Sequence, residues 1–305
     1  MRTTLTFLLL LGLGCSAESP QQQEPAATTP KEIAKTTTEP SSTTTKTSLV
    51  TLGGNITETV FALGLGDQVI GVDASSLYPE EATKRSQVGY YRQVSAEGII
   101  SLAPKLVLAS DASGPPDVLE KVTSVGIRIE KLPSTKTLDG AKARIKAISD
   151  LLGEPQRGAK LIQAMEAQIK SVTTPKKPKK VLFIYARGAG SANVAGAKTA
   201  GDEMIRLAGG INAVQEYEGY KPINAESIAA AAPDVILLTT RGLKSIGGAD
   251  AVAKMEGIAL TPAAKNQAIV ALDDLMLLGF GPRTGEAVLA LSKLLNPEAT
   301  EVQTP

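Results

Sequence analysis

The stretch that decides the fold is Ser95-Ala-Glu-Gly-Ile-Ile-Ser-Leu-Ala-Pro-Lys-Leu-Val-Leu108, because a second segment of the chain follows the same pattern. That segment, Asn224-Ala-Glu-Ser-Ile-Ala-Ala-Ala-Ala-Pro-Asp-Val-Ile-Leu237, aligns with the first without a gap. Each has a helix-capping residue, a glutamate, a proline and then an apolar strand, and a Gly-Tyr pair precedes each, at Gly89 and Gly219. The repeat predicts two lobes of similar build, with these segments in related places at a shared cleft or rim.

Each copy belongs to a series of alternating strands and helices. In the first half, strands are expected at 49–52, 68–72, 106–109 and 127–132, with helices at 56–65, from Ser95 to before Pro104, and at 115–125. In the second half, strands are expected at 181–185, 235–238 and 268–271, with helices after Thr199 and over 282–295. Strand, helix and strand at this spacing suggest a parallel sheet, so the fold class is α/β with two lobes.

Residues 1–15 predict an export signal. Met1 and Arg2 precede an apolar run, Leu5 to Leu13, that is shorter than a membrane-spanning helix requires. The chain's one cysteine, Cys15, follows this run and resembles the processing site of bacterial lipoproteins, whose cysteine carries the lipid. We therefore expect a lipid-anchored protein in the periplasm or at the cell surface. An ordinary cleaved signal with an incidental thiol is the alternative.

Composition divides the rest of the chain. Residues 16–47 are mostly Ser, Thr, Pro, Gln, Glu and Ala, which predicts a disordered tether. We expect an N-terminal α/β lobe over 48–153, an interlobe helix and connector over 154–178, a C-terminal α/β lobe over 179–297 and a tail over 298–305. The helix is indicated by an apolar stripe from Leu161 to Val172, and the lysine- and proline-rich run after it is typical of a solvated connector.

Charge and composition exclude several functions. The formal net charge is only +1, so there is no basic field to hold nucleic acid. The chain has no histidine, which removes the usual general base, the Ser-His and Cys-His pairs and the commonest zinc ligand. Most hydrolase and zinc-site hypotheses fail on that ground.

The first candidate site is Gly89-Tyr-Tyr-Arg-Gln-Val-Ser-Ala-Glu97, which gathers two phenols, a guanidinium and a helix start. Ser95 is the expected cap of that helix, so we place the tyrosines on the loop before it, where side chains are available to a ligand. The alternative is that one tyrosine packs inside and the other is solvated.

Six segments together resemble the haem-binding proteins of bacterial ABC importers: Thr51–Glu58, Val88–Glu97, Ala195–Ala200, Leu207–Ala213, Gly219–Pro222 and Leu278–Thr284. The resemblance covers about residues 48 to 297, and the Gly-Tyr-x-Arg-Gln segment is its most specific part. It implies a class III periplasmic binding protein, with two Rossmann-like lobes joined by one long helix, as in cobalamin and ferric-siderophore binding proteins. It also implies a role in iron acquisition, in which the protein carries haem to a membrane permease and ATPase. We expect the protein to be a monomer.

The same resemblance implies roles for the first site. In that family a tyrosine phenolate is an axial ligand of ferric haem iron, and this tyrosine falls on Tyr90. Tyr91 is then a haem contact and the fallback ligand, and Arg92 is the cation that favours the phenolate. For Arg92, a surface salt bridge is the alternative.

Further roles concern the haem carboxylates, the second face of the iron and the permease. Arg241 is the first choice for binding the haem propionates, ahead of Lys221, Arg187 and Arg283. Without a histidine, the iron is five-coordinate or takes another group, and Met255 and Met276 are candidates that more often belong to a core. Glu97 and Glu226 match the family's permease-docking glutamates, for which helix capping is the alternative.

Three other functions compete with haem binding. The paired lobes argue against one of them, a purely structural surface lipoprotein. A cobalamin or ferric-siderophore receptor of the same fold would use aromatic walls or an arginine cluster instead of Tyr90. An enzyme with a phosphate loop at 188–196 is disfavoured, because Asn193 stands where the dinucleotide fingerprint needs its third glycine and no catalytic base is evident. We therefore expect a binding protein and not an enzyme.

Overall fold

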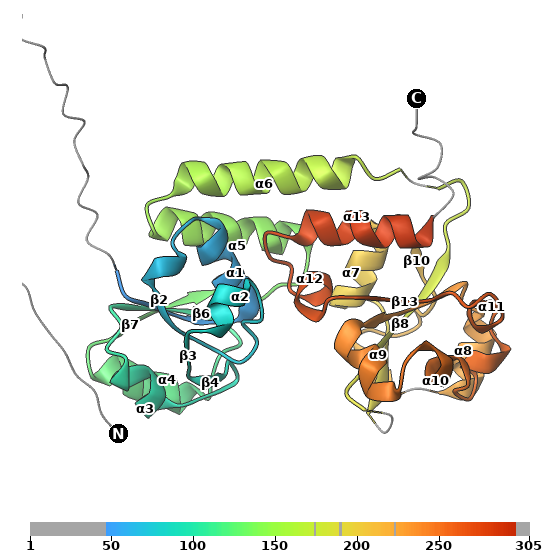
Figure 1. Ribbon diagram of the computed structural model, residues 1–305, viewed down its shortest axis with the longest axis horizontal. Coiled ribbons are helices and arrows are strands. Elements are labelled where there is room, and N and C mark those ends of the chain that lie inside the picture. The colour runs from blue at the N-terminus through green and yellow to red at the C-terminus, as the bar shows by residue number, and fades with distance from the viewer. Residues whose placement is uncertain (1–46, 174, 189–190, 223, 297–305) are drawn as a thin grey trace, which may run out of the picture. The chain divides into compact units, whose positions relative to one another are not determined.

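A computed structural model describes residues 47–173, 175–188, 191–222 and 224–296 (Figure 1). The predicted export signal, Cys15, the tether up to residue 46 and the predicted tail at 298–305 lie outside the described residues. Within the described residues, no helix is both long enough and apolar enough to cross a bilayer.

The first sheet has the strand order β3-β2-β1-β6-β7, and all neighbouring strands are parallel. These strands are β1 (Leu49–Leu52), β2 (Val69–Val72), β3 (Ser86–Gln87), β6 (Leu106–Ser110) and β7 (Arg128–Leu132). The central strands β1 and β6 are buried along their whole length, as expected for a parallel sheet that is covered on both faces. The predicted parallel sheet is confirmed.

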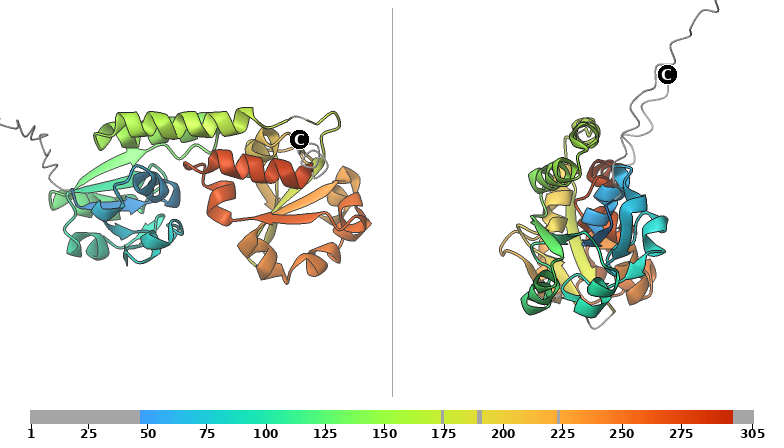
Figure 2. Two further views of the ribbon diagram at one scale, coloured as in Figure 1. Left: turned by 45° about the horizontal axis from the view of Figure 1, so that its top comes forward. Right: turned by 90° about the vertical axis from the view of Figure 1, so that its left-hand side faces the viewer.

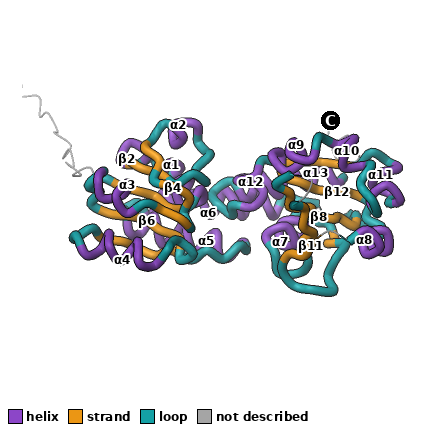
Figure 3. Tube along the Cα trace, turned by 90° about the horizontal axis from the view of Figure 1, so that it is seen from below, coloured by secondary structure: helices purple, strands orange, loops and turns teal. Residues whose placement is uncertain are grey.

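Helices cover both faces of this sheet, and together they form the N-lobe (Figure 3). They are α1 (Gly54–Ala62), α2 (Glu80–Thr83), α3 (Ala96–Ser101), α4 (Pro116–Ser124) and α5 (Leu138–Leu151), with a 3-10 turn η1 (Gly66–Gln68). Successive residues of β1 point to opposite faces, so Leu49 packs in the core with α1 and α5 while Val50 packs with α3 and α4. The helix expected at 56–65 begins two residues earlier, at Gly54, and ends at Ala62.

The second sheet has the order β11-β9-β8-β12-β13, with β10 beside β8. Its strands are β8 (Lys180–Ala186), β9 (Ala192–Ala195), β10 (Ile211–Asn212), β11 (Tyr220–Pro222), β12 (Val235–Thr239) and β13 (Ile269–Leu272). Strand β9 runs antiparallel to both β8 and β11, which the sequence analysis did not predict. The C-lobe sheet is therefore mixed.

The helices of the C-lobe are α7 (Ala200–Leu207), α8 (Ala225–Ala231), α9 (Thr240–Ile246), α10 (Ala249–Ala253), α11 (Pro262–Lys265), α12 (Asp274–Leu278) and α13 (Thr284–Leu295), with a 3-10 turn η2 (Ile258–Leu260). Alternate residues of β8 again serve two cores: Phe183 packs on one face and Leu182 on the other.

The sequence repeat is also a structural repeat. The side chains of Ser95 and Asn224 cap α3 and α8 by accepting from the third residue of each helix, at 3.0 and 2.9 Å. After each helix an alanine, Ala103 or Ala232, adopts the left-handed conformation with φ 45° before the proline. The chain then enters a central strand, β6 or β12. Both lobes thus contain the predicted order of cap, helix, proline and strand, although the C-lobe sheet is mixed and the N-lobe sheet is parallel.

Helix α6 (Pro155–Lys170) occupies the predicted interlobe segment and packs against α5 and α13 (Figure 2). One hydrophobic core contains Ala141 and Ile145 of α5, Met165 of α6 and the C-lobe residues Phe183 and Val288. The helices that connect the lobes therefore share a buried core with the C-lobe.

Candidate functional site

The two tyrosines of the first candidate site lie on a small hairpin of β4 (Gly89–Tyr90) and β5 (Gln93–Val94). Tyr91 and Arg92 form its turn, so the expectation of a loop is corrected. Strands of two residues are too short to show any periodicity in the sequence. Gly89 has φ 100°, and a Cβ there would lie 2.7 Å from the Gln93 carbonyl oxygen, so the hairpin requires glycine at this position.

A fully buried aspartate, Asp73, holds this hairpin against the sheet. One carboxylate oxygen accepts from the backbone N–H groups of Tyr91 and Ser75, at 3.1 and 2.9 Å. The other accepts from the N–H of Gly53 at 2.9 Å and the hydroxyl of Ser76 at 3.0 Å. Because Gly53 precedes α1, Asp73 fixes the hairpin relative to both β2 and α1.

The rings of Tyr90 and Tyr91 meet edge to face, with centroids 4.6 Å apart, and the guanidinium of Arg92 lies 5.2 Å from the Tyr91 ring. Burial, followed by a hydrogen bond with Tyr90, raises the pKa of Tyr91 to about 12. The Tyr91 phenol is therefore harder to ionise than the phenol of an exposed tyrosine. The surface salt bridge considered for Arg92 is not found, since no carboxylate of the described residues lies within 4.0 Å of it.

The C-lobe contributes a similar group from the end of β8. The Tyr185 hydroxyl accepts from Nε of Arg187 at 2.8 Å, and the guanidinium lies 5.5 Å from the Tyr185 ring. The Tyr185 ring is also 6.0 Å from that of Tyr220 on β11. Tyr185 raises the pKa of Arg187 through this hydrogen bond and its charge, and Tyr90 of the N-lobe adds to the increase. Arg187 thus lies beside tyrosines of both lobes.

The sequence analysis named Arg187 only as a propionate candidate, and it missed Tyr185 and Tyr220. Two signals were present. Tyr185-Ala-Arg187 has the same Tyr-x-Arg spacing as Tyr90-Tyr-Arg92, and Tyr220 belongs to the Gly-Tyr pair before the second copy of the repeat.

The other predicted propionate-binding residues lie in different surroundings. Arg241 is exposed near the start of α9, where its backbone N–H donates to Asp274 at 3.1 Å. The ammonium of Lys221 lies 4.4 Å from the ring centre of Tyr217. Arg283 forms an ion pair with Glu58 and is already engaged.

The structure leaves two interpretations for each of the remaining candidates, the methionines considered as iron ligands and the glutamates considered for permease docking. Met255 and Met276 are partly buried and pack against the two C-lobe cores, which favours the core interpretation. Glu97 and Glu226 are exposed in the first turns of α3 and α8. This position suits both helix capping and contact with another protein.

The loop 279–283, between α12 and α13, receives donors from the N-lobe. The Gly279 carbonyl oxygen accepts from Nδ2 of Asn55 at 2.8 Å and from Nζ of Lys136 at 3.2 Å. The Phe280 carbonyl oxygen accepts from Nη2 of Arg144 at 2.5 Å. These carbonyls follow the last turn of α12, where the helix dipole favours cations. We call residues 279–283 the linking loop.

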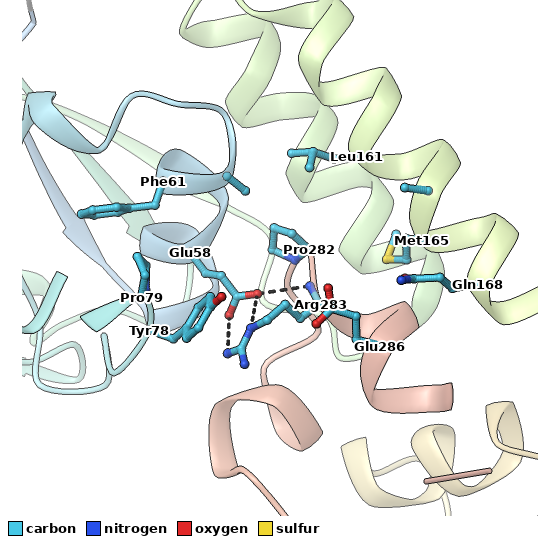
Figure 4. A pocket seen from close by; sticks show the side chains of 12 residues that line it. Glu58, Phe61, Tyr78, Pro79, Leu161, Met165, Gln168, Pro282, Arg283 and Glu286 are labelled. Atoms are coloured by element: carbon cyan, nitrogen blue, oxygen red, sulfur yellow. Dashed lines mark hydrogen bonds and ion pairs between the residues drawn. The ribbon is translucent and has the colours of Figure 1, made fainter. Parts of the chain in front are cut away.

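The linking loop ends in an ion pair beside a cavity of about 350 Å³ (Figure 4). Glu58 of α1 accepts from the backbone N–H, Nε and Nη2 of Arg283, at 3.1, 3.1 and 3.0 Å. The Arg283 guanidinium stacks 3.6 Å from the ring centre of Tyr78. Burial raises the pKa of Glu58, and the contacts with Arg283 oppose that increase.

Comparison with known proteins identifies the family. The family model described as "Periplasmic binding protein" matches residues 49–275. The chain belongs to this family. A solved structure of the periplasmic haem-binding protein RhuT from Roseiflexus sp. RS-1 is 42% identical, with a TM-score of 0.79, and the match covers 83% of this chain and 98% of RhuT.

Two curated relatives of this periplasmic binding protein carry other names. An uncharacterised ABC transporter substrate-binding lipoprotein, YvrC of Bacillus subtilis, is 30% identical over 82% of this chain and 80% of YvrC. A vitamin B12-binding protein of Vibrio parahaemolyticus is 28% identical over 79% of this chain and 86% of that protein.

The family and the fold establish the general class of this protein. The chain is a class III periplasmic binding protein, the substrate-binding component of an ABC transporter, and its family indicates an exported protein. Its homologues are binding proteins and not enzymes. In the segment 188–196 considered as a phosphate loop, residues 189 and 190 lie outside the described residues and 192–195 form the antiparallel strand β9, whereas a phosphate loop leads into a helix.

Proposed function

We propose that this protein captures haem between its lobes, with the Tyr90 phenolate as an axial ligand of ferric iron, and delivers it to an ABC permease. The observation that carries the proposal is the pair of Tyr-x-Arg groups, one from each lobe, in which Arg92 lies against the ring of Tyr91 and Arg187 donates to the hydroxyl of Tyr185. The likeness to a haem-binding protein at 42% identity supports the same ligand.

The surroundings of Tyr90 suit an iron-binding phenolate. Ferric iron itself favours the phenolate form of a tyrosine ligand, and Arg92, two residues after Tyr90, adds a positive charge to the hairpin. Tyr91, whose pKa lies near 12, is better suited to pack against the porphyrin than to ionise. Tyr185, held by Arg187, is the C-lobe group that we assign to the second face of the bound ligand.

The test is an absorption titration of the purified protein with hemin. Wild type should give a Soret band and a phenolate-to-iron charge-transfer band. Tyr90→Phe should lose the charge-transfer band and weaken binding by at least as much as the roughly 10- to 100-fold that loss of an outer-shell partner of a metal ligand costs. Tyr91→Phe should keep the charge-transfer band. Tyr78→Phe, at the linking loop, is the matched control and should behave as wild type.

Vitamin B12 is the second candidate ligand, because curated relatives at 28% identity carry that name. Titration with cyanocobalamin separates the two proposals. Tight binding of cyanocobalamin together with weak, Tyr90-independent binding of hemin would overturn the haem proposal in favour of this one. The same titration with a ferric siderophore covers the remaining ligand class.

Delivery to the permease is assigned to Glu97 and Glu226. Their exposed carboxylates, at matching positions of α3 and α8, are suited to pairing with arginines of a two-fold permease. The Glu97→Lys and Glu226→Lys variants should reduce haem uptake by cells without changing haem affinity. Uptake that is unchanged in the double alanine variant would remove this assignment.

Lipidation at Cys15 is tested by metabolic labelling with a fatty acid. Cys15→Ser should abolish the labelling.

A further inference from the structure

Three cations gather at the edge of the N-lobe sheet where its parallel strands end. Lys136 and Arg144 follow β7, on the loop before α5 and on α5 itself, and Arg92 lies on the turn of the tyrosine hairpin. Lys136 and Arg144 donate to the adjacent carbonyl oxygens of Gly279 and Phe280, so these two cations are neighbours. The carbonyl oxygen of Tyr91 accepts from the N–H of Gly114, which follows β6, so the turn that carries Arg92 lies at the same edge of the sheet. In open α/β sheets, ligands bind at this carboxyl edge.

The cluster lacks matching anions. Among the described residues, no carboxylate lies within 4.0 Å of any of the three cations. Asp111, which follows β6, is the one acidic group that stabilises the charges of both Lys136 and Arg144, and it is itself exposed. Arg144 is buried and Lys136 is half-buried, whereas Arg92 is exposed. Burying a cation without a counter-ion is costly, so the charges of Lys136 and Arg144 call for an explanation.

Arg144 has a structural role. Its guanidinium donates to the carbonyl oxygens of Pro133, at 2.6 Å, and Phe280, at 2.5 Å, and its side chain is almost fully buried. It therefore holds the loop before α5 against the linking loop, and it is not available to a ligand.

Lys136 is different, because its side chain is only half-buried and protein groups of the described residues engage only part of its hydrogen-bonding capacity. Its ammonium carries three N–H donors, and the described residues provide one acceptor, the Gly279 carbonyl oxygen at 3.2 Å. Burial, together with Arg144 and Arg92, lowers its pKa to about 8. The side chain thus remains a cation at neutral pH, with donors to spare and charged neighbours of the same sign.

We propose that Lys136 binds a carboxylate of the transported ligand, with Arg92 as the second cation of the same subsite. This inference rests on the proposed function, since the carboxylate is that of a haem propionate. The propionate supplies the negative charge that the cluster lacks, and it accepts from the unused donors of Lys136. Lys136 replaces Arg241, the residue chosen from the sequence, as the main propionate-binding residue.

The position of Lys136 adds a consequence for the lobes. The same ammonium that binds the carboxylate also donates to Gly279 of the linking loop. An anion beside Lys136 keeps the ammonium protonated, so the bound ligand strengthens a hydrogen bond between the lobes.

The experiment compares hemin with hemin dimethyl ester, which has the same iron and ring but no free carboxylates, in one detergent buffer at pH 7. Wild type should bind hemin about 10- to 100-fold more tightly than the ester, as expected for a charge-assisted hydrogen bond. Lys136→Met should lose this preference by weakening hemin alone, and Lys136→Arg should retain part of it. Lys146→Met, an exposed lysine of α5 paired with Asp150, is the matched control and should keep the full preference.

Each outcome has a distinct meaning. Equal weakening of hemin and ester in Lys136→Met would overturn the inference, because Lys136 would then act on the fold and not on the carboxylate. Equal binding of both porphyrins by wild type would overturn it without any variant, even where Lys136→Met fails to fold. Failure of wild type to bind either porphyrin would instead refute the proposed haem function.

Discussion

Replacing Lys136 with methionine should stabilise the ligand-free protein, although it weakens ligand binding. The pKa of Lys136 falls from an ordinary value of 10.5 to about 8, and at about 1.4 kcal/mol per pH unit this drop corresponds to about 3 kcal/mol of cost for the buried charge. Methionine removes that cost and fills a similar volume. It also removes the hydrogen bond to Gly279, worth about 1 kcal/mol, whose acceptor still receives Asn55. The expected net gain is about 2 kcal/mol at pH 7.

Urea unfolding of the ligand-free protein measures this gain, and its pH dependence tests the cause. Above pH 8 the folded protein releases the Lys136 proton, whereas the unfolded chain keeps it up to about pH 10.5. The unfolded state then binds more protons, so wild-type stability should rise with pH across this window and approach that of Lys136→Met. A variant at least 1 kcal/mol less stable than wild type at pH 7, or a difference that stays constant from pH 7 to 10.5, would refute the reasoning. Lys146→Met should change stability by less than about 0.5 kcal/mol.

Three other substitutions test the contacts described above. Glu58→Gln removes the closer of the two carboxylates beside the largely buried Arg283, the other being Asp273 at 3.9 Å, and should cost about 3 kcal/mol in urea unfolding. A cost below about 1 kcal/mol would show that the pair with Glu58 does not stabilise the linking loop. Asp73→Asn keeps the shape of the side chain but turns one acceptor into a donor, so it should lower the free energy of unfolding by about 2 kcal/mol and weaken the hemin charge-transfer band. An unaltered band would exclude a role of Asp73 in positioning the tyrosine hairpin. Ser95→Ala and Asn224→Ala should each cost about 1 kcal/mol and add in the double variant, as expected for independent caps of the two lobes.

Much of the fold follows from local sequence signals. The strands β1, β6, β8 and β12 are continuous apolar runs bounded by turn residues, and α4 and α13 fall within about two residues of their predicted limits. The cap, glutamate and proline of the repeat predicted α3 and α8 correctly, because capping depends on residues only a few positions apart.

Other elements carry no clear local signal. Helix α5 places the fully buried Arg144 on the same face as Ala141, Ile145 and Ile148, and this charge interrupts the apolar stripe that would mark a buried face. Strand β9 is short, and although β8 directly precedes it, its other antiparallel partner, β11, lies beyond α7 and β10 in the sequence.

The candidate site was predictable only in part. The tyrosine pair stood out because Tyr90 and Tyr91 are adjacent in the chain. Lys136 and Asp73 occur in no local motif, and their importance arises from neighbours brought together by the fold. Tyr185 lies on a buried strand where an aromatic residue is ordinary, so its contact with Arg187 becomes informative only in three dimensions.

In the linking loop, Asn55, Lys136 and Arg144 all donate to main-chain oxygens at Gly279 and Phe280. The N-lobe therefore recognises the path of the backbone here and is indifferent to the side chain that Phe280 carries. Since a single oxygen serves both Asn55 and Lys136, a rotation of that one peptide plane would release two donors at once. A change of conformation at the peptide after Gly279 would therefore break both of these contacts between the lobes in one step.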